Sequence, residues 1–540
     1  MLTRLTILYR RLFGAGSFDS PLERDFSQIE VMDLALREPG DDSGLDDQTW
    51  HDLELADLFA RLDNATTPLG QQLLYHRLRS QRGCPPGELQ RYRALAGDED
   101  RACRIRRALS PMRHSSMYHL FPWVRTFRAA RLPNAYLLGL LAVAPFVLGA
   151  FIPAYPVLIA PTLLFLGINF AISRAMSPRI DGDLRYLMTL NLLLACSRSL
   201  RDTGIDCTSP GGACDKPRAR RYRADWRVSL LVSEPTIGVG TFVEYVIEYL
   251  NVFSLFELIA YQGFARRVDD YRRDYLDLIT RVAEVDLRLG VSRYVSRYES
   301  VVEPAFGRPD ELSVVGLYHP LIAHPVENDF SSMRNLVIVS GANMSGKSTF
   351  MKAMAICVVF ARGLGFCHAR QAVLPDACAR TSLSLRDTVS GGSSYFQMEI
   401  ARLKEFLDEM DANRPCLYFV DEPFKGTNRP EKLAALIAIG KFVGKRAFFF
   451  FSTHDTELCA ELPGSETVHF TSTQDEAGRL RYDYKLSRGV SQDHYAISLM
   501  EQSGYNPIIV ADARRRLNEL RAGPSLEVVE HQARQSGLNR

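Results

Sequence analysis

Hydrophobic and polar positions follow three different patterns along this 540-residue chain. Between residues 20 and 120, and again from Val268 to Leu289, apolar positions recur at helical spacing, which predicts long helices packed along one another. Between these two regions, the run from Leu132 to Ser173 contains no charged residue. Past Pro304, short and fully apolar runs alternate with helical segments, which indicates a parallel sheet covered on both faces.

The uncharged run is about twice as long as the ~20 residues that one helix needs to cross a bilayer. Pro153 and Pro156 lie in its middle and favour a turn. We therefore predict two membrane passes, at about Asn134–Phe151 and Tyr155–Ser173, so that residues of about 134–173 are embedded in the membrane. The alternative is a buried helical hairpin in a soluble core, but soluble helices rarely extend so far without a charge.

Basic residues on both sides of this hairpin predict its orientation. Arg125, Arg128 and Arg131 precede it, and Arg174 and Arg179 follow it. Because basic flanks stay in the cytoplasm, both termini and the C-terminal domain are expected on the cytoplasmic side of an inner, multi-pass membrane protein. A further helix is expected from Asp183 to Arg201.

A basic loop with interleaved aromatic residues follows that helix at residues 216–227. Its members are Lys216, Arg218, Arg220, Arg221, Tyr222, Arg223, Trp226 and Arg227. A cytoplasmic loop near a bilayer is attracted to anionic lipid headgroups, and a similar cluster neutralises DNA phosphates. We rank lipid proximity or simple solvation first and DNA second.

Composition excludes few classes of protein. Apolar residues make up 46% and charged residues 24% of the chain, as in ordinary folded proteins. The net charge of +2 gives no global field for a polyanionic partner, so any nucleic-acid surface has to be local. The ten cysteines are scattered, which predicts reduced thiols in a reducing compartment. The first residues lack the continuous apolar core of an export signal.

A phosphate-binding loop is predicted between an apolar strand and a helix. The sequence Gly341-Ala-Asn-Met-Ser-Gly-Lys-Ser348 fits the pattern GxxxxGK[ST] in that setting. Its backbone N–H groups and the helix N-terminus make an anion cradle, Lys347 reaches the β- and γ-phosphates, and Ser348 binds Mg²⁺. The predicted nucleotide-binding residues of this loop are Gly341, Ala342, Asn343, Met344, Ser345, Gly346, Lys347, Ser348 and Thr349.

Two later strands end in polar residues that complete such a site. Asp421 ends the apolar run "CLYFVD" and is expected to hold Mg²⁺, and Glu422 beside it is expected to orient or deprotonate the attacking water. His454 ends the run "FFFFSTH" and is expected to touch the γ-phosphate or that water. We expect the strand before the phosphate loop and the strand of Asp421 to lie side by side in the sheet. Glu422, His454 and Lys347 are the predicted catalytic residues.

The stretches "GANMSGKST", "VDEPFKGTN" and "FSTHDTEL" resemble the ATPase domain of the MutS mismatch-repair family, which belongs to the ABC-type ATPases. The segment "VSGGSSYFQMEI" is similar to the family's signature segment, and Ser394 matches the serine that completes the partner subunit's ATP site. The resemblance implies a homodimer with two composite ATP sites. It also implies that Gly426, Thr427 and Asn428 lie in a loop that crosses between subunits.

Weaker similarities extend over more of the chain. "YHPLI", with His319 and Pro320, resembles the strand that leads toward the phosphate loop, and "LDDQTWHDLEL" and "LDNATTPLGQQLLYHRL" resemble the helical lever domain. Two features depart from the family. The Phe-x-Glu motif of mismatch readers appears only at Phe242–Glu244, where a packed helix is the simpler interpretation. Lys485 stands where we expect an imidazole that stacks on adenine.

We therefore predict an α/β P-loop ATPase domain of the ABC type joined to an α-helical lever domain that contains a two-helix transmembrane hairpin. The predicted parts are a lever region at 1–125, the hairpin at 126–178, a second lever region at 179–303, the ATPase domain at 304–523 and a flexible tail at 524–540. The predicted function is that of a Mg²⁺-dependent ATPase that couples ATP-driven dimerisation to DNA binding in a repair-related process. The alternatives are an ATP-dependent membrane remodelling or assembly factor that does not bind DNA and, last, a transporter.

Overall fold

The computed structural model describes most of the chain and divides it into two compact units. The described residues are 22, 24–37, 44–205, 252–342, 344–384, 395–412, 415–474, 480–490, 497, 500–501 and 503–522. The first unit comprises Met1–Gly44 and Ala56–Glu299, and the second comprises Leu45–Leu55 and Ser300–Arg540. The basic loop at 216–227 and the tripeptide Phe242–Glu244 lie outside the described residues.

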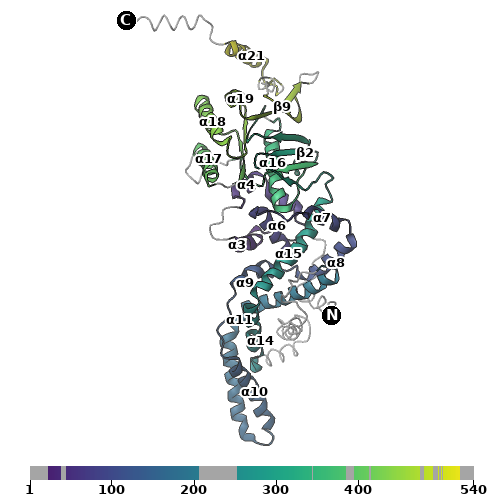
Figure 1. The fold of residues 1–540 in the computed structure, drawn as a ribbon. Coiled ribbons are helices and arrows are strands. Elements are labelled where there is room, and N and C mark those ends of the chain that lie inside the picture. The colour runs from purple at the N-terminus through teal and green to yellow at the C-terminus, as the bar shows by residue number, and fades with distance from the viewer. Residues whose placement is uncertain are drawn as a thin grey trace, which may run out of the picture. The chain divides into compact units, whose positions relative to one another are not determined.

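The first unit is helical throughout its described part (Figure 1). Its elements are α2 (Phe26–Ile29), α3 (Val31–Leu36), α5 (Leu55–Leu62, which begins at the end of the second unit's segment), α6 (Pro68–Ser80), α7 (Glu88–Ala96), α8 (Glu99–Leu109), η1 (Ser110–Met112), η2 (Ser115–His119), α9 (Leu120–Thr126), α10 (Ala135–Phe151), η3 (Pro156–Leu158), α11 (Ile159–Asp202), α14 (Phe256–Asp270) and α15 (Arg272–Val295). The helix α6 begins at Pro68, where the Thr67 side chain caps the first turn.

A buried carboxylate joins α15 to the start of α6. Asp286 is fully buried and accepts hydrogen bonds from Thr66 N at 2.8 Å, Thr67 N at 2.7 Å and Thr67 Oγ1 at 2.7 Å. Burial raises the pKa of Asp286 to about 6, although these hydrogen bonds act in the opposite direction. Gly70 allows this close approach, because a Cβ there would lie 2.4 Å from Asp286 Oδ2.

The continuous stripe predicted from Val268 to Leu289 is divided between two helices. Its apolar positions are buried except Tyr271, which is intermediate, and the stripe is interrupted there, because α14 ends at Asp270 and α15 begins at Arg272. Tyr271 lies between them with φ −119° and ψ 22°, outside the helical range. The periodicity continued across this break, so it revealed the buried face and not the helix boundary.

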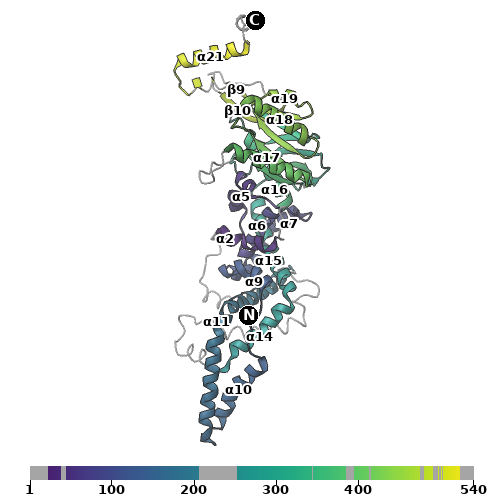
Figure 2. The same ribbon diagram turned by 90° about the vertical axis from the view of Figure 1, so that its left-hand side faces the viewer.

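The predicted hairpin corresponds to α10 and α11, which lie side by side in both views (Figures 1 and 2). The prediction of separate helices at Tyr155–Ser173 and Asp183–Arg201 was wrong, because α11 runs without a break from Ile159 to Asp202. Pro178 lies inside this helix. A proline removes one helical hydrogen bond, and the helix-forming residues on both sides keep the remaining backbone groups paired.

One helix in the described part of the chain, Pro156–Asp202 with its leading turn, is long and apolar enough to cross a membrane. Its most apolar window is only 17% buried. The 17-residue α10 is apolar but shorter than such a span. A buried hairpin in a soluble core is therefore not what the structure contains, since large apolar side chains on both helices are exposed.

The second unit contains two sheets and the helices that cover them. Its elements are α4 (Asp47–Asp52), β1 (Ala305–Phe306), β2 (Leu312–Leu317), β3 (Asn328–Ser332), β4 (Leu336–Gly341), α16 (Lys347–Leu364), β5 (Gln371–Leu374), β6 (Cys378–Ser382), α17 (Tyr395–Asp411), β7 (Cys416–Asp421), α18 (Arg429–Val443), β8 (Phe449–Thr453), α19 (Glu457–Glu461), β9 (Glu466–Gln474), β10 (Leu480–Arg488) and α21 (Pro507–Ala522). The smaller sheet has the order β1-β5-β2-β3, and the larger has the order β10-β9-β4-β8-β7-β6.

The larger sheet is parallel from β9 to β6 and is covered on both faces, as the fully apolar strands predicted. Phe449 and Phe451 on β8 pack into a core with side chains of α17, α18 and α19. Phe450 faces the opposite way, toward Phe330 and Phe419. The phenylalanine run is thus part of a buried central strand, with α17 and α18 on one side and α16 on the other (Figure 1).

The cysteines in the described part of the chain form no disulfide bonds with one another.

Candidate functional site

The predicted site residues meet at the carboxyl ends of three neighbouring strands. The phosphate-loop sequence follows β4, His454 follows β8, and Asp421 is the last residue of β7. The expectation that β4 and β7 are neighbours was wrong, because β8 lies between them. This order places His454 between the loop and the Asp421–Glu422 pair, since carboxyl ends of parallel strands share one edge of the sheet.

The loop after β4 has a backbone that only glycine fits at two points. Gly341 has φ +137° and Gly346, the N-cap of α16, has φ +113°. A Cβ at Gly341 would lie 3.1 Å from the Phe470 backbone oxygen. Met344 also has a positive φ and is exposed at the tip of the loop, while Asn343 lies outside the described residues. The helix N-terminus is thereby left open to an anion.

Lys347 is buried inside this loop and points back at it. Its Nζ donates hydrogen bonds to Gly341 O at 2.8 Å and to Ala342 O at 2.9 Å. Burial lowers the pKa of Lys347, while the carboxylates of Glu422 and Asp421 act in the opposite direction. A buried ammonium group whose partners among the described residues are carbonyl oxygens is suited to a phosphate, which would supply full negative charge.

The affinity for ATP is expected to fall at alkaline pH because of Lys347. Its lowered pKa means that it loses its proton at a lower pH than an ordinary lysine does. The dissociation constant for ATP, measured by equilibrium binding from neutral pH up to pH 10, should therefore begin to rise below the ordinary lysine pKa of 10.5. In Lys347→Arg the guanidinium stays charged, so its affinity should not change over this range. A wild-type affinity that is constant up to pH 10 would contradict this prediction.

The Ser345 hydroxyl is also oriented into the loop. It is buried and has no hydrogen-bond partner among the described residues. Buried hydroxyl groups are normally paired. Together with the carbonyl-bound ammonium of Lys347, this hydroxyl indicates that the loop fits a ligand rich in acceptor oxygens, such as a nucleotide phosphate.

A hydroxyl and a carboxylate form the predicted metal site. Ser348 Oγ donates a hydrogen bond of 2.8 Å to Asp421 Oδ2. The other carboxylate oxygen of Asp421 accepts a hydrogen bond from Ser452 Oγ on β8. Hydroxyl and carboxylate oxygens are hard donors that suit Mg²⁺, which takes few protein ligands and retains waters or phosphate oxygens. The donor set of Ser348 and Asp421 therefore fits this ion.

Glu422 is held in a strained backbone conformation beside β8. Its φ is +47°, and its N–H donates to Ser452 O at 3.2 Å and to Ser452 Oγ at 3.0 Å. Its carboxylate contacts His454 Nε2 and lies 3.2 Å from Lys425 Nζ. Burial disfavours the charged form, but His454 and Lys425 prevail and lower the pKa of Glu422 to about 2. Glu422 is thus an ionised acceptor at neutral pH.

His454 connects Glu422 to the phosphate loop. Its Nδ1 lies 3.1 Å from Gly341 O, and since a carbonyl oxygen only accepts, Nδ1 carries a proton in this bond. Its Nε2 faces the carboxylate of Glu422. The imidazole thus bridges the phosphate loop and Glu422 at the position where a terminal phosphate would enter.

Sequence reasoning missed three residues of this site. Ser452 braces Asp421 and Glu422, and Lys425 pairs with Glu422. Tyr484 places its ring beside the loop, 3.4 Å from a Cβ built at Gly346. It neighbours Lys485, whose Nζ instead donates to Glu327 O at 2.7 Å. Ser452 lies two residues before His454, which is the one signal in the sequence. Only the strand order shows that it lies beside Asp421 and Glu422 on the next strand.

The structure also describes the surroundings of several other predicted residues. Thr349 is exposed on α16. Asn428 caps α18 by accepting from Glu431 N at 3.1 Å, so the loop that contains Gly426, Thr427 and Asn428 is a helix entrance in this subunit. His319 and Pro320 follow β2 in the smaller sheet, outside the strand itself. Ser394 lies outside the described residues.

Comparison with known proteins agrees with this geometry. Residues 337–521 match the family described as MutS domain V. The chain is 30% identical over 248 residues to the DNA mismatch repair protein MutS of Thermus aquaticus, which covers 45% of this chain and 30% of that protein. It is 31% identical over 254 residues to human MutS protein homolog 4, covering 42% of this chain and 26% of that protein. The MutS of Natronomonas pharaonis is 28% identical over 258 residues, 45% of this chain and 29% of that protein.

The chain thus spans less than a third of the length of these relatives. The resemblance to MutS proteins predicted from the motifs is supported for the C-terminal part of the chain, which contains the site described above.

Proposed function

We propose that this chain, which carries a match to MutS domain V, is a Mg²⁺-dependent ATPase attached to a membrane. The convergence of Lys347, Ser348, Asp421, Glu422 and His454 at one edge of the sheet carries the proposal. Phosphoryl transfer needs positioning and charge stabilisation more than covalent chemistry, and these residues supply both.

Each residue has a proposed role at a stated atom. Lys347 Nζ leaves the loop carbonyls and binds the terminal phosphates, and the Ser345 hydroxyl donates to a phosphate oxygen. The Glu422 carboxylate accepts a hydrogen bond from the attacking water, and His454 Nε2 turns from Glu422 to the γ-phosphate. When bound to Ser348 and Asp421, Mg²⁺ supplies charge that offsets the phosphate oxygens.

A homodimer with composite sites is part of the proposal. Among the described residues, the open helix N-terminus and the exposed Met344 leave one side of the loop uncovered. We assign Ser394 of a second subunit to that side on the resemblance alone. In this proposal ATP binding favours the dimer and hydrolysis favours its dissociation. The helical unit changes its conformation in response to these two steps.

The membrane attachment is supported by the packing of α10, α11 and α14. Along the first part of α11 the buried residues are polar: Thr162, Asn169 and Ser173. Asn169 Nδ2 donates to Leu141 O at 2.8 Å and to Phe253 O at 2.7 Å. The large apolar residues of the same region are exposed, namely Leu163, Leu164, Ile168 and Phe170 on α11 and Tyr136, Leu137, Leu140, Val143, Phe146 and Val147 on α10.

A water-soluble protein would place these side chains the other way round. An apolar surface around small and polar interior contacts is typical of helices in lipid. We therefore propose that α10 and the first part of α11 are inserted in the cytoplasmic membrane, with the ATPase unit in the cytoplasm, and that the basic residues 216–227 contact anionic lipid headgroups.

The partner that responds to ATP is proposed to be DNA. The relatives that match this chain include proteins named for DNA mismatch repair, and this similarity supports a repair-related role. The exposed apolar hairpin favours a second candidate, in which the same ATPase remodels or assembles membrane components without DNA.

Steady-state ATPase activity of the full-length protein in nanodiscs tests the proposal. The rates are compared without addition, with duplex DNA, with mismatched DNA and with anionic lipid, each at low and moderate salt. A DNA-specific rise that fades with salt is expected for the DNA-responsive ATPase. A lipid response with unchanged DNA rates supports the membrane alternative, and absence of ATP hydrolysis in every condition refutes the enzymatic proposal. Release of the chain from membranes by alkaline washing refutes the attachment.

A further inference from the structure

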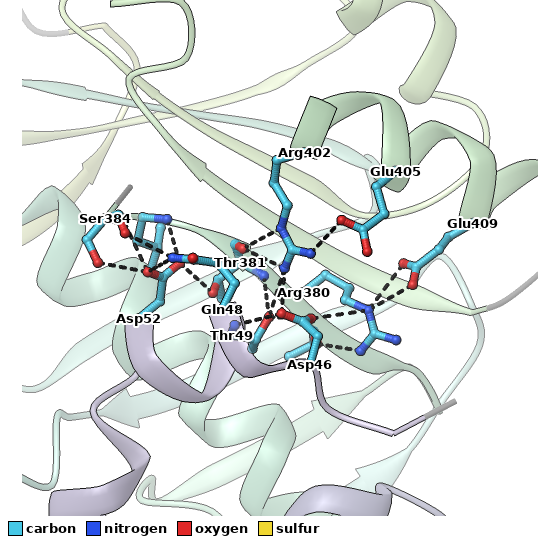
Figure 3. Close-up of polar contacts among 12 residues, drawn as sticks. Asp46, Gln48, Thr49, Asp52, Arg380, Thr381, Ser384, Arg402, Glu405 and Glu409 are labelled. Atoms are coloured by element: carbon cyan, nitrogen blue, oxygen red, sulfur yellow. Dashed lines mark hydrogen bonds and ion pairs between the residues drawn. The ribbon is translucent and has the colours of Figure 1, made fainter. Parts of the chain in front are cut away.

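The short helix α4, far from the ATPase residues in sequence, belongs to the second unit. Its segment Leu45–Leu55 is separated from the rest of that unit by more than 240 residues. Figure 3 shows α4 against β6 and α17, with polar side chains filling the space between them. Because β6 is an edge strand of the larger sheet, its outer backbone groups need partners other than a further strand.

Thr49 Oγ1 accepts from Thr381 N at 3.0 Å, and Asp52 binds groups at and just beyond the carboxyl end of β6. Its Oδ2 accepts from Leu383 N at 2.8 Å and from Thr381 Oγ1 at 2.8 Å, and its Oδ1 accepts from Ser384 N at 3.2 Å and Ser384 Oγ at 2.8 Å. Gln48 adds bonds from its Nε2 to Asp52 Oδ1 at 2.8 Å and to Ser384 O at 2.9 Å. One buried carboxylate thus fixes the carboxyl end of β6 (Figure 3).

A second set of contacts ties the same helix to α17. Arg402 Nη2 donates to Asp46 Oδ1 at 2.8 Å and to Thr381 O at 3.0 Å. Arg380 lies between Asp46, at 3.6 Å, and Glu409, at 3.0 Å. Both arginines are buried and Asp46 is only partly exposed, so these charge-assisted bonds are poorly screened and favour one arrangement of α4, β6 and α17.

The carboxyl end of β6 lies beside the carboxyl end of β7, where Asp421 is the last residue. Leu383, directly held by Asp52, lines a small cavity together with Glu399 and Asp421. Ser382 and Val420 are paired in the register of β6 and β7, one residue before Asp421. A shift of the β6 end therefore changes the walls around the Asp421 carboxylate, which Ser348 contacts from the other side.

We propose that Asp52 is a positioning residue of the ATPase site, which holds the end of β6 against β7 and so keeps Asp421 in place for the nucleotide-bound metal. This inference rests on the proposed function. The helix α4, which precedes the ATPase sequence by more than 240 residues, is then part of the ATPase unit. When Asp52 is removed, Leu383 N and Ser384 N lose their acceptor, so the end of β6 beside Asp421 becomes more mobile.

The test uses full-length Asp52→Asn, with Asp57→Asn as a matched control because Asp57 is exposed and undergoes the same charge change. Hydrogen exchange of the ligand-free protein should show faster exchange of the amides at the end of β6 in Asp52→Asn. The affinity for a fluorescent ATP analogue should be within twofold of wild type in EDTA but at least fivefold weaker with Mg²⁺. The ATPase kcat should fall about tenfold.

Ser384→Ala removes a single hydrogen bond to Asp52 and should give a smaller change in the same direction, even if Asp52→Asn proves too unstable to purify. Unchanged exchange at β6 overturns the positioning role. An equal loss of ATP affinity with and without Mg²⁺ also overturns it, because general damage to the fold would weaken binding in both conditions. If wild type neither binds nor hydrolyses ATP, the proposed function itself fails, and this inference fails with it.

Discussion

Glu422→Gln is expected to reduce ATP turnover by about 10²- to 10⁴-fold while ATP still binds. The amide keeps the size of the side chain but has no carboxylate to accept the proton of an attacking water. The lowered pKa of Glu422, to about 2, means that the wild-type group is ionised throughout the pH range in which ATPases are assayed. Single-turnover hydrolysis and equilibrium binding of ATP, measured on the same preparation, separate chemistry from binding.

Glu461→Gln is the control, because Glu461 is exposed at the end of α19 and lies outside the site. Its turnover should equal that of the wild type. Full turnover in Glu422→Gln would remove Glu422 from the mechanism and leave His454 as the group that orients water. A loss of ATP binding equal to the loss of turnover would instead mean that Glu422 mainly maintains the charge balance of Lys347 and His454.

Asp286→Ala is expected to destabilise the helical unit by about 3–5 kcal/mol, because it leaves buried donors of Thr66 and Thr67 without an acceptor. For a unit of this size, the melting temperature should fall by roughly 10 °C. The folded pKa of about 6 lies above the ordinary value of 3.8. The stabilisation that depends on this shift is therefore full below about pH 4 and is lost as the pH rises through 6.

Differential scanning fluorimetry in detergent, at pH 5 and pH 8, measures both effects. The destabilisation by Asp286→Ala should be larger at pH 5. Asp277→Ala serves as a control on the same helix, since its ion pair with Arg281 is partly exposed, and it should change the melting temperature by at most 1–2 °C. Equal melting of Asp286→Ala and Asp277→Ala would show that the α6–α15 connection contributes little to stability.

The sequence by itself determined the local elements of the ATPase unit. Fully apolar runs predicted β4, β7 and β8, and a glycine-rich loop between strand and helix predicted the phosphate site. These features are local: a buried parallel strand needs apolar residues on both faces, and the φ values of Gly341 and Gly346, above +100°, favour glycine. The same reasoning placed Asp421 and His454 at strand ends before their neighbours were known.

The tertiary structure alone decided which strands and helices meet. The sequence carries no signal that β8 lies between β4 and β7, so Ser452 was missed although it braces Asp421 and Glu422. Nor does periodicity show that α11 continues through Pro178, because a proline costs one hydrogen bond that the rest of a long helix can tolerate. The placement of α4 on β6 depends on partners over 300 residues away, and Asp52 has no local feature that distinguishes it from the other acidic residues of its helix. Local conformation follows from neighbours in the chain, whereas long-range pairing follows from the burial and hydrogen bonding of the whole unit.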